Sequence, residues 1–324
     1  MKLSVAELED KVAAGIARLG YEKDEARIIK EVLLYAEMRG NNQGITKIAT
    51  DGVPAVEDVP GYKLVNQNKC GALISGGQAM VATQKAADLA VSLAEKHGVG
   101  IVGTNHATSS SGAIGYFSRQ IAGAGYIGIA VVGTGPYVAP TGSCEAKLGT
   151  NPISYAFPTS KSPVVFDCTT AAMAYFGVVE AKLKGEPLPE GFAFDENGNP
   201  TTDAAEALGG SVTTFGAHRG YGLSLLVQLL AGPLVGATYA GANAEKGAGT
   251  LILAIDPGLL LDKAEYLANS TELCELVTGA KPLGGADVQL PGERGDAIRS
   301  TAMEAGEIEV ADAIWEELCA FVDA

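Results

Sequence analysis

Apolar residues recur at helical spacing in several stretches of the chain. The first stretch begins at Ser4, which has Glu7 three residues later in the spacing of a capping box, and it ends near Gly20. The same periodicity predicts further helices over 24–38, 78–97, 113–124, 171–183, 220–230, 263–277 and 312–322.

Between these helices lie short runs that are rich in β-branched residues. They predict strands over 99–102, 126–132, 153–157, 164–166 and 250–255. Helices and strands alternate, so the pattern indicates an α/β or α+β fold. A chain of 324 residues can form one large domain or two of ordinary size.

Composition and charge exclude several classes of protein. Apolar residues make up 47% of the chain and its net charge is −15, which suits a globular protein and opposes binding to nucleic acid or to an anionic membrane. A small anionic substrate would need a local basic pocket. The five cysteines form no C-x-x-C pair, which predicts reduced thiols in a cytoplasmic protein. No Cys/His spacing resembles a zinc site, and no apolar run is long enough for a membrane span, so neither a metal nor a span is expected.

Two stretches match the G-x-G-x-x-G fingerprint of dinucleotide-binding proteins. One begins at Gly98 and the other at Gly123. The fingerprint acts only where a strand precedes the glycines and a helix follows them, so that the helix N-terminus faces the pyrophosphate. Here a predicted helix ends and a strand begins, so both matches are interpreted as glycines that terminate helices.

Three polar positions are candidates for chemistry from their local setting. His106 follows a predicted strand, where α/β proteins often place functional side chains, although a structural histidine is an open alternative. His218 and Arg219 precede a predicted helix, whose N-terminus could hold a phosphate. Asp167 follows another strand and could either cap the next helix or contact a ligand.

Read together, five segments resemble the malate/L-lactate dehydrogenase family, which includes sulfolactate, ureidoglycolate and 2,3-diketogulonate oxidoreductases and cyclic-imine carboxylate reductases. Their order and spacing follow the family over nearly the whole chain. The segments are Asn105-His106 with Gly112 and Gly115-Tyr116, then 148–152 (LGTNP), 166–170 (FDCTT), 216–223 (GAHRGYGL) and 290–294 (LPGER).

The resemblance implies a fold other than the Rossmann fold. A cofactor domain with a mixed sheet, over 106–280, would be inserted into a largely helical substrate and dimerisation domain made of 1–105 and 281–324. It implies NAD or NADP as cofactor and a homodimer. The cofactor contacts would be His106, Asp167, Cys168, Thr169, Thr170, Ala171, Ala172, His218, Arg219, Gly292, Glu293 and Arg294.

The chain departs from the family where the catalytic histidine is expected. The family's Ser-His-Gly motif is replaced by Asn42-Gln43-Gly44, in a stretch that is one residue shorter. By family position, Gln43 stands in place of the proton-donating His, and Lys47 in place of the Arg that holds the substrate carboxylate. Arg39 would belong to the same substrate region. Glutamine cannot titrate, so it can only donate a hydrogen bond and polarise the substrate oxygen.

The predicted function is therefore hydride transfer between NAD(P)H and a small 2-oxo acid or cyclic 2-imino acid. Lys47 and Arg39 would bind the substrate, and Asn42 and Gln43 would orient its carbonyl or imine. His106, or a water held by Asn42 and Gln43, would supply the proton. The alternative is a family member that binds cofactor or metabolite but has lost catalysis together with its histidine.

Overall fold

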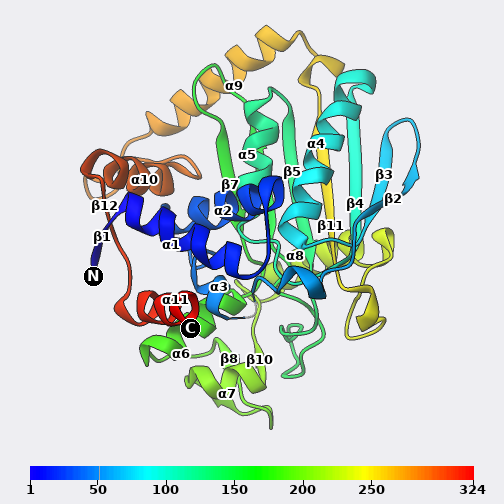
Figure 1. Ribbon diagram of the computed structural model, residues 1–324. Coiled ribbons are helices and arrows are strands. Elements are labelled where there is room, and N and C mark those ends of the chain that lie inside the picture. Colours follow the sequence, from blue (N-terminus) through cyan, green and yellow to red (C-terminus); the bar gives the residue numbers. More distant parts are fainter. Residues whose placement is uncertain (51) are drawn as a thin grey trace.

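The structure is a computed structural model that describes residues 1–50 and 52–324 (Figure 1). Its centre is a seven-stranded mixed sheet with the strand order β2-β3-β4-β11-β5-β6-β7. Only β3 and β4 run parallel, and the other neighbours are antiparallel. The strands are β2 (Lys63–Gln67), β3 (Gly71–Ser75), β4 (Val99–Ala107), β11 (Ala248–Ile255), β5 (Ile127–Gly133), β6 (Ile153–Phe157) and β7 (Val164–Cys168).

Helices cover both faces of this sheet. Helices α4 (Ala79–His97) and α5 (Gly115–Gly123) pack on one face, and α8 (His218–Ala231) packs on the other. Successive residues of β11 therefore enter different cores, because side chains alternate across a strand. Ile252 is buried in the core beneath α4, whereas Leu251 packs with Val227 of α8.

Both ends of the chain build a helical layer beside the sheet (Figure 1). β1 (Lys2–Ser4) pairs with β12 (Glu307–Glu309), which joins the two ends directly. The layer contains α1 (Val5–Arg18), α2 (Lys23–Glu37), the short α3 (Thr46–Ala49), α10 (Glu293–Ala305) and α11 (Asp312–Asp323). One large core cluster runs from this layer to the sheet, so the two parts share buried apolar residues.

A smaller lobe follows β7 and surrounds a second core. Helix α6 (Tyr175–Lys184) packs against α7 (Ala204–Gly209), next to a three-stranded sheet in the order β10-β8-β9. Its strands are β8 (Ala193–Phe194), β9 (Pro200–Thr201) and β10 (Ser211–Val212). Helix α9 (Lys263–Thr278) lies apart from this lobe, crosses the far end of the main sheet and has no buried side chain. Among the described residues, no helix is both long and apolar enough to cross a membrane.

The mixed α/β fold and most predicted elements are confirmed. Gly98 ends α4 in the left-handed conformation with φ 82°, which confirms its interpretation as a helix-terminating glycine. Helix α6 begins at Tyr175 rather than at residue 171, since Ala171 instead bridges to Thr214. The expected domain boundary at residue 105 falls inside β4, and the main sheet takes β2 and β3 from before it. The division into two domains stays a prediction.

Candidate active site

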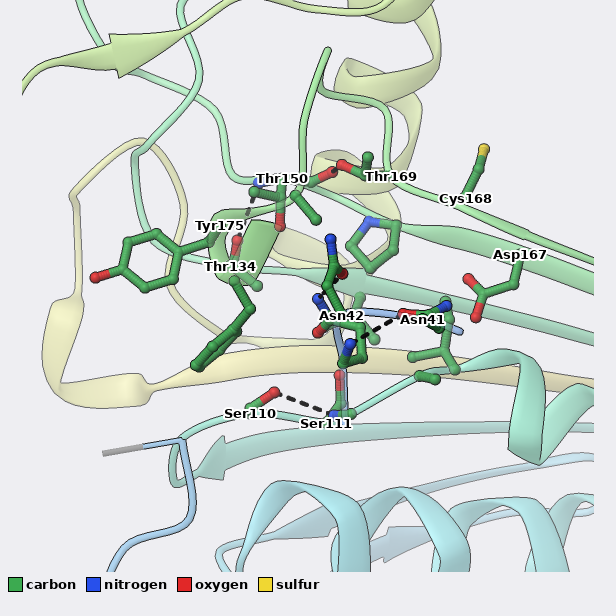
Figure 2. Close-up of a pocket in the computed structure, with 18 of the residues that line it drawn as sticks. Asn41, Asn42, Ser110, Ser111, Thr134, Thr150, Asp167, Cys168, Thr169 and Tyr175 are labelled. Atoms are coloured by element: carbon green, nitrogen blue, oxygen red, sulfur yellow. Dashed lines mark hydrogen bonds between the residues drawn. The ribbon is translucent and has the colours of Figure 1, made fainter. Parts of the chain in front are cut away.

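A large cavity lies where the helical layer, the main sheet and the start of α6 meet. Its volume is about 1360 Å³. The walls come from segments that are far apart in sequence: 39–43, 109–114, 134–137, 167–169, 172–176, and 292 with 294–295. Figure 2 shows Asp167 and the amides of Asn41 and Asn42 projecting into this space.

The segment after α2 brings three amide side chains to the cavity wall. The backbone N–H of Gln43 donates to Asn41 Oδ1 at 2.9 Å, and Gln43 Nε2 donates to Asn42 Oδ1 at 3.0 Å. A primary amide has two N–H donors, so Gln43 keeps one for a ligand. Glu37 holds the end of the segment by accepting the N–H of Ile45 at 3.0 Å, and burial raises the pKa of Glu37 to about 7. The structure therefore brings Asn42 and Gln43 together at the cavity, and their role in orienting the substrate stays a prediction.

Arg39 also borders the cavity, but its charge is already paired. It donates to the carboxylate of Asp296 and, at 2.8 Å, to the carbonyl oxygen of Gly292. Arg119 contacts the same carboxylate at 3.0 Å. Burial opposes ionisation of Asp296, but the hydrogen bonds from the two arginines outweigh it and lower the pKa of that carboxyl group. Arg39 thus joins α2 to α10, and this geometry favours a positioning role over direct substrate binding.

Lys47 lies in α3, four residues after Gln43, and is fully buried. Within the described residues its Nζ has no hydrogen-bond partner, and it lies 3.2 Å from the centroid of the Phe176 ring. Burial lowers the pKa of Lys47 well below its usual range. Phe176 lines the cavity whereas Lys47 does not, so the ring covers the amine on the cavity side.

His106 is not among the residues that line the cavity. It is exposed, and its Nδ1 lies 2.9 Å from Asn105 Oδ1 and 3.2 Å from Ser75 Oγ. The next residue on β4, Ala107, does line the cavity. His106 has a φ of 51° and lies at the register shift between β4 and β11, so its side chain does not follow the alternation of a regular strand. Its place outside the cavity lining gives no support to His106 as the proton donor.

Part of the expected cofactor segment, at the end of β7 and just after it, lies at the cavity. Asp167, Cys168, Thr169 and Ala172 line the cavity. Asp167 accepts the N–H of Gly115 at 2.7 Å, and burial raises its pKa to about 6 against the opposing effects of that N–H and of Arg39. Thr170 and Ala171 are buried instead. They anchor the segment to neighbouring loops, since Thr170 Oγ1 donates to the carbonyl of Asn151 at 3.0 Å and Ala171 forms an isolated β-bridge with Thr214.

The remaining predicted cofactor residues divide between the cavity and the surface. Gly292 and Arg294 line the cavity. Glu293 turns back to accept the N–H of Leu290 at 2.7 Å. His218 and Arg219 are exposed at the start of α8 and do not line the cavity, so the structure of this single chain does not bring them to the other candidates.

Several residues of the site were not predicted from the sequence. Tyr137 and Tyr175 pack edge to face, with ring centroids 4.9 Å apart, and both line the cavity. Ser110, Thr134 and Phe176 complete this wall. The Ser/Gly-rich composition of the loop after β4 was the only local signal, because the aromatic residues belong to helical and extended stretches whose patterns indicate burial alone.

The walls of the cavity fit a dinucleotide. The hydroxyl group of Tyr137 is buried without a hydrogen-bond partner in the described part of the chain, so a bound ligand could satisfy it. Helix α6 has no side-chain cap, which leaves its first N–H groups available to an anion such as a phosphate. The surrounding hydroxyls of Thr134, Thr150 and Thr169 add polar contacts (Figure 2). NAD or NADP held here would supply or accept the hydride.

Fold and site together define a class: an α/β protein with a cofactor-sized cleft between a mixed sheet and a helical layer, without the Rossmann glycine turn. Comparison with known proteins gives the family. The model of the malate/L-lactate dehydrogenase family matches residues 3–319, and the chain belongs to this family.

Similar proteins are known from archaea and bacteria. The chain is 36% identical over 292 residues to a malate/(S)-sulfolactate dehydrogenase of Methanothermus fervidus, covering 85% of this chain and 84% of the other. It is 28% identical over 337 residues to the ureidoglycolate dehydrogenase (NAD(+)) of Escherichia coli, covering 98% and 95%. The solved sulfolactate dehydrogenase of Methanocaldococcus jannaschii superposes with a TM-score of 0.82 at 29% identity, covering 100% and 97%.

Proposed function

We propose that the chain is an NAD(P)-dependent oxidoreductase that interconverts a small 2-oxo acid and its 2-hydroxy acid, with a cyclic 2-imino acid as the other candidate substrate. Family membership supports the oxidoreductase over the alternative of an impaired binding protein. The observation that carries the proposal is the shared cavity, which brings the Asn42–Gln43 amides and the Asp167–Thr169 strip to one space.

The substrate half of the site would be the segment 41–47. Gln43 and Asn42 would orient the 2-oxo oxygen through their N–H donors. Lys47 would supply the positive charge for the carboxylate once the Phe176 ring moves aside. Asp296 neutralises Arg39, so within this segment Lys47 is the cation without a carboxylate partner among the described residues.

A homodimer in the cytoplasm completes the proposal. The outer side of α8 exposes a row of leucines that a second copy could cover, at Leu223, Leu225, Leu226 and Leu229. His218 and Arg219 begin the same helix, so a dimer interface there would change their surroundings. The five cysteines are all unpaired in the structure, which agrees with a reducing compartment.

Ligand binding and a gain-of-function variant test the proposal together. NADH or NADPH should raise the thermal midpoint of the wild type, because a ligand that binds only the folded protein stabilises it. The wild type should also reduce at least one 2-oxo or cyclic 2-imino acid. A protein that binds cofactor, shows no turnover and acquires turnover only with Gln43→His would instead be the impaired binding protein.

A further inference from the structure

The missing histidine leaves the reaction without the proton donor that the family resemblance places beside the Asn42–Gln43 amides. Hydride addition to a 2-oxo group develops negative charge on oxygen, and that oxygen must gain a proton. Gln43 can donate a hydrogen bond but cannot release a proton at neutral pH. His106 contacts Ser75 and Asn105 and lies outside the cavity lining.

Lys47 has the chemistry that this position requires. Its side chain is fully buried, and its ammonium group contacts the face of Phe176 at 3.2 Å instead of a carboxylate. No charged group in the described chain contributes to the shift of its pKa, which burial alone lowers. The carboxyl group that does contact this segment, on Glu37, is engaged by the N–H of Ile45. A buried amine without a counter-ion releases its proton more readily than a surface lysine.

The backbone and side-chain packing hold Lys47 next to the cavity wall. A Cβ added at Gly52 would lie 2.6 Å from Lys47 Cβ and 2.9 Å from its Cγ, so the backbone at Gly52 packs closely against the base of the lysine side chain. On the cavity side the Phe176 ring covers the amine, and Phe176 belongs to the first turn of α6. Rotation of that one side chain would therefore connect the amine with the space beside Gln43.

We propose that Lys47 is the proton donor of the reaction and that Phe176 is the gate that separates it from the cavity until substrate binds. This inference rests on the proposed function. The carboxylate and the 2-oxo oxygen of the substrate are neighbours, and an ammonium group has three N–H donors, so one lysine can contact both.

The proton transfer balances with the hydride transfer. When C2 of the substrate receives the hydride, the π electrons of its C=O bond move to oxygen. That oxygen forms a bond to a proton of Lys47 as the N–H bond breaks. A neutral amine remains; it regains a proton from solvent after the product leaves, and the carboxylate of the next substrate stabilises the charged form.

Replacement of Lys47 by arginine separates this role from charge alone. Lys47→Arg keeps a cation for the carboxylate, but guanidinium does not release its proton at accessible pH. We expect kcat for a 2-oxo acid to fall about 100-fold or more, the usual contribution of a general acid, while KM changes much less. Lys184→Arg is the matched control, because Lys184 is on α6 and its ion pair with Glu180 can be kept by arginine.

The imino acid gives a second comparison on the same variants. A protonated cyclic imine already carries its proton, so Lys47→Arg should reduce its turnover far less than that of the 2-oxo acid. Wild-type kcat in Lys47→Arg, or an equal loss with both substrates, would overturn Lys47 as the donor. A wild type that turns over neither substrate would instead refute the proposed function, which keeps the two failures distinct.

Chemical labelling tests the same residue without turnover. Because neutral amines react with acetic anhydride and the Phe176 ring covers the amine, Lys47 should be modified faster in Phe176→Ala than in the wild type. Oxalate, a small dicarboxylate, should slow that modification by occupying the site. Equal labelling of Lys47 in the wild type and in Phe176→Ala would contradict the proposal, whether or not Lys47→Arg folds.

Discussion

Glu37 provides a stability test with a defined dependence on pH. Its carboxyl group accepts the N–H of Ile45, and one oxygen lies only 2.1 Å from where a Cβ on Gly44 would be, so the group is closely enclosed. Burial raises its pKa from an ordinary 4.5 to about 7. Between these values the folded chain holds a proton that the unfolded chain has released, so stability falls as pH rises through this window.

The size of the effect follows from the same two values. One pKa unit corresponds to about 1.4 kcal/mol, so the interval from 4.5 to about 7 gives a loss of up to about 3 kcal/mol once the pH exceeds the folded value. Glu37→Gln removes the titration and keeps an oxygen for the N–H of Ile45. The variant should match the wild type at about pH 4 and exceed its unfolding free energy by about 1–3 kcal/mol at about pH 8.

Denaturant unfolding at several pH values measures this difference directly. Exposed Glu9 is the control, because Glu9→Gln should shift stability little at any pH. An advantage of Glu37→Gln that stays constant with pH, or a variant that is less stable than the wild type at high pH, would refute the reasoning.

Three further substitutions test other parts of the site. Asp296→Ala should lower the free energy of unfolding, measured with denaturant, by about 2–4 kcal/mol, since it leaves the buried Arg39 guanidinium without its carboxylate. A change near zero would show that this ion pair does not stabilise the fold. Gly177→Ala would place a Cβ 2.6 Å from Asn42 Nδ2 and displace that amide, so kcat/KM should fall about tenfold or more while the unfolding free energy changes little. Unaltered kinetics would show that Asn42 takes no part in the reaction. His106→Asn should lower kcat less than about fivefold, because its ring lies outside the cavity lining; a loss of about 100-fold or more would restore it as the proton donor.

The sequence predicted the elements with strong periodicity and missed those without it. The long helices α4 and α8 and the central strands β5 and β11 were expected, because each has one or two buried apolar faces. β2 is exposed along its whole length, so no apolar pattern marks it. Helix α10 buries only Ala302 and likewise has little apolar periodicity.

The site was predicted where it depends on neighbours in sequence and missed where it depends on packing. Asn42, Gln43 and the residues at the end of β7 lie in short segments that the resemblance singled out. The structure brings these segments to one cavity, and the roles of the residues stay predictions. Nothing local shows that Asp296 pairs with Arg39, or that Phe176 covers Lys47, because these contacts join distant segments. The register shift near the end of β4, where Ala107 rather than His106 lines the cavity, also becomes visible only in the folded chain.

Hydride transfer between a nicotinamide cofactor and a small 2-oxo or 2-imino acid is the reaction proposed for this cavity. It can be measured as the initial rate of NADH and NADPH oxidation by the purified wild type over a panel of 2-oxo acids and cyclic imino acids, with Lys47→Met in parallel. We expect saturable oxidation with at least one substrate and a large loss in Lys47→Met. A wild type that binds the reduced cofactor but oxidises it no faster than buffer, with every substrate, would contradict it.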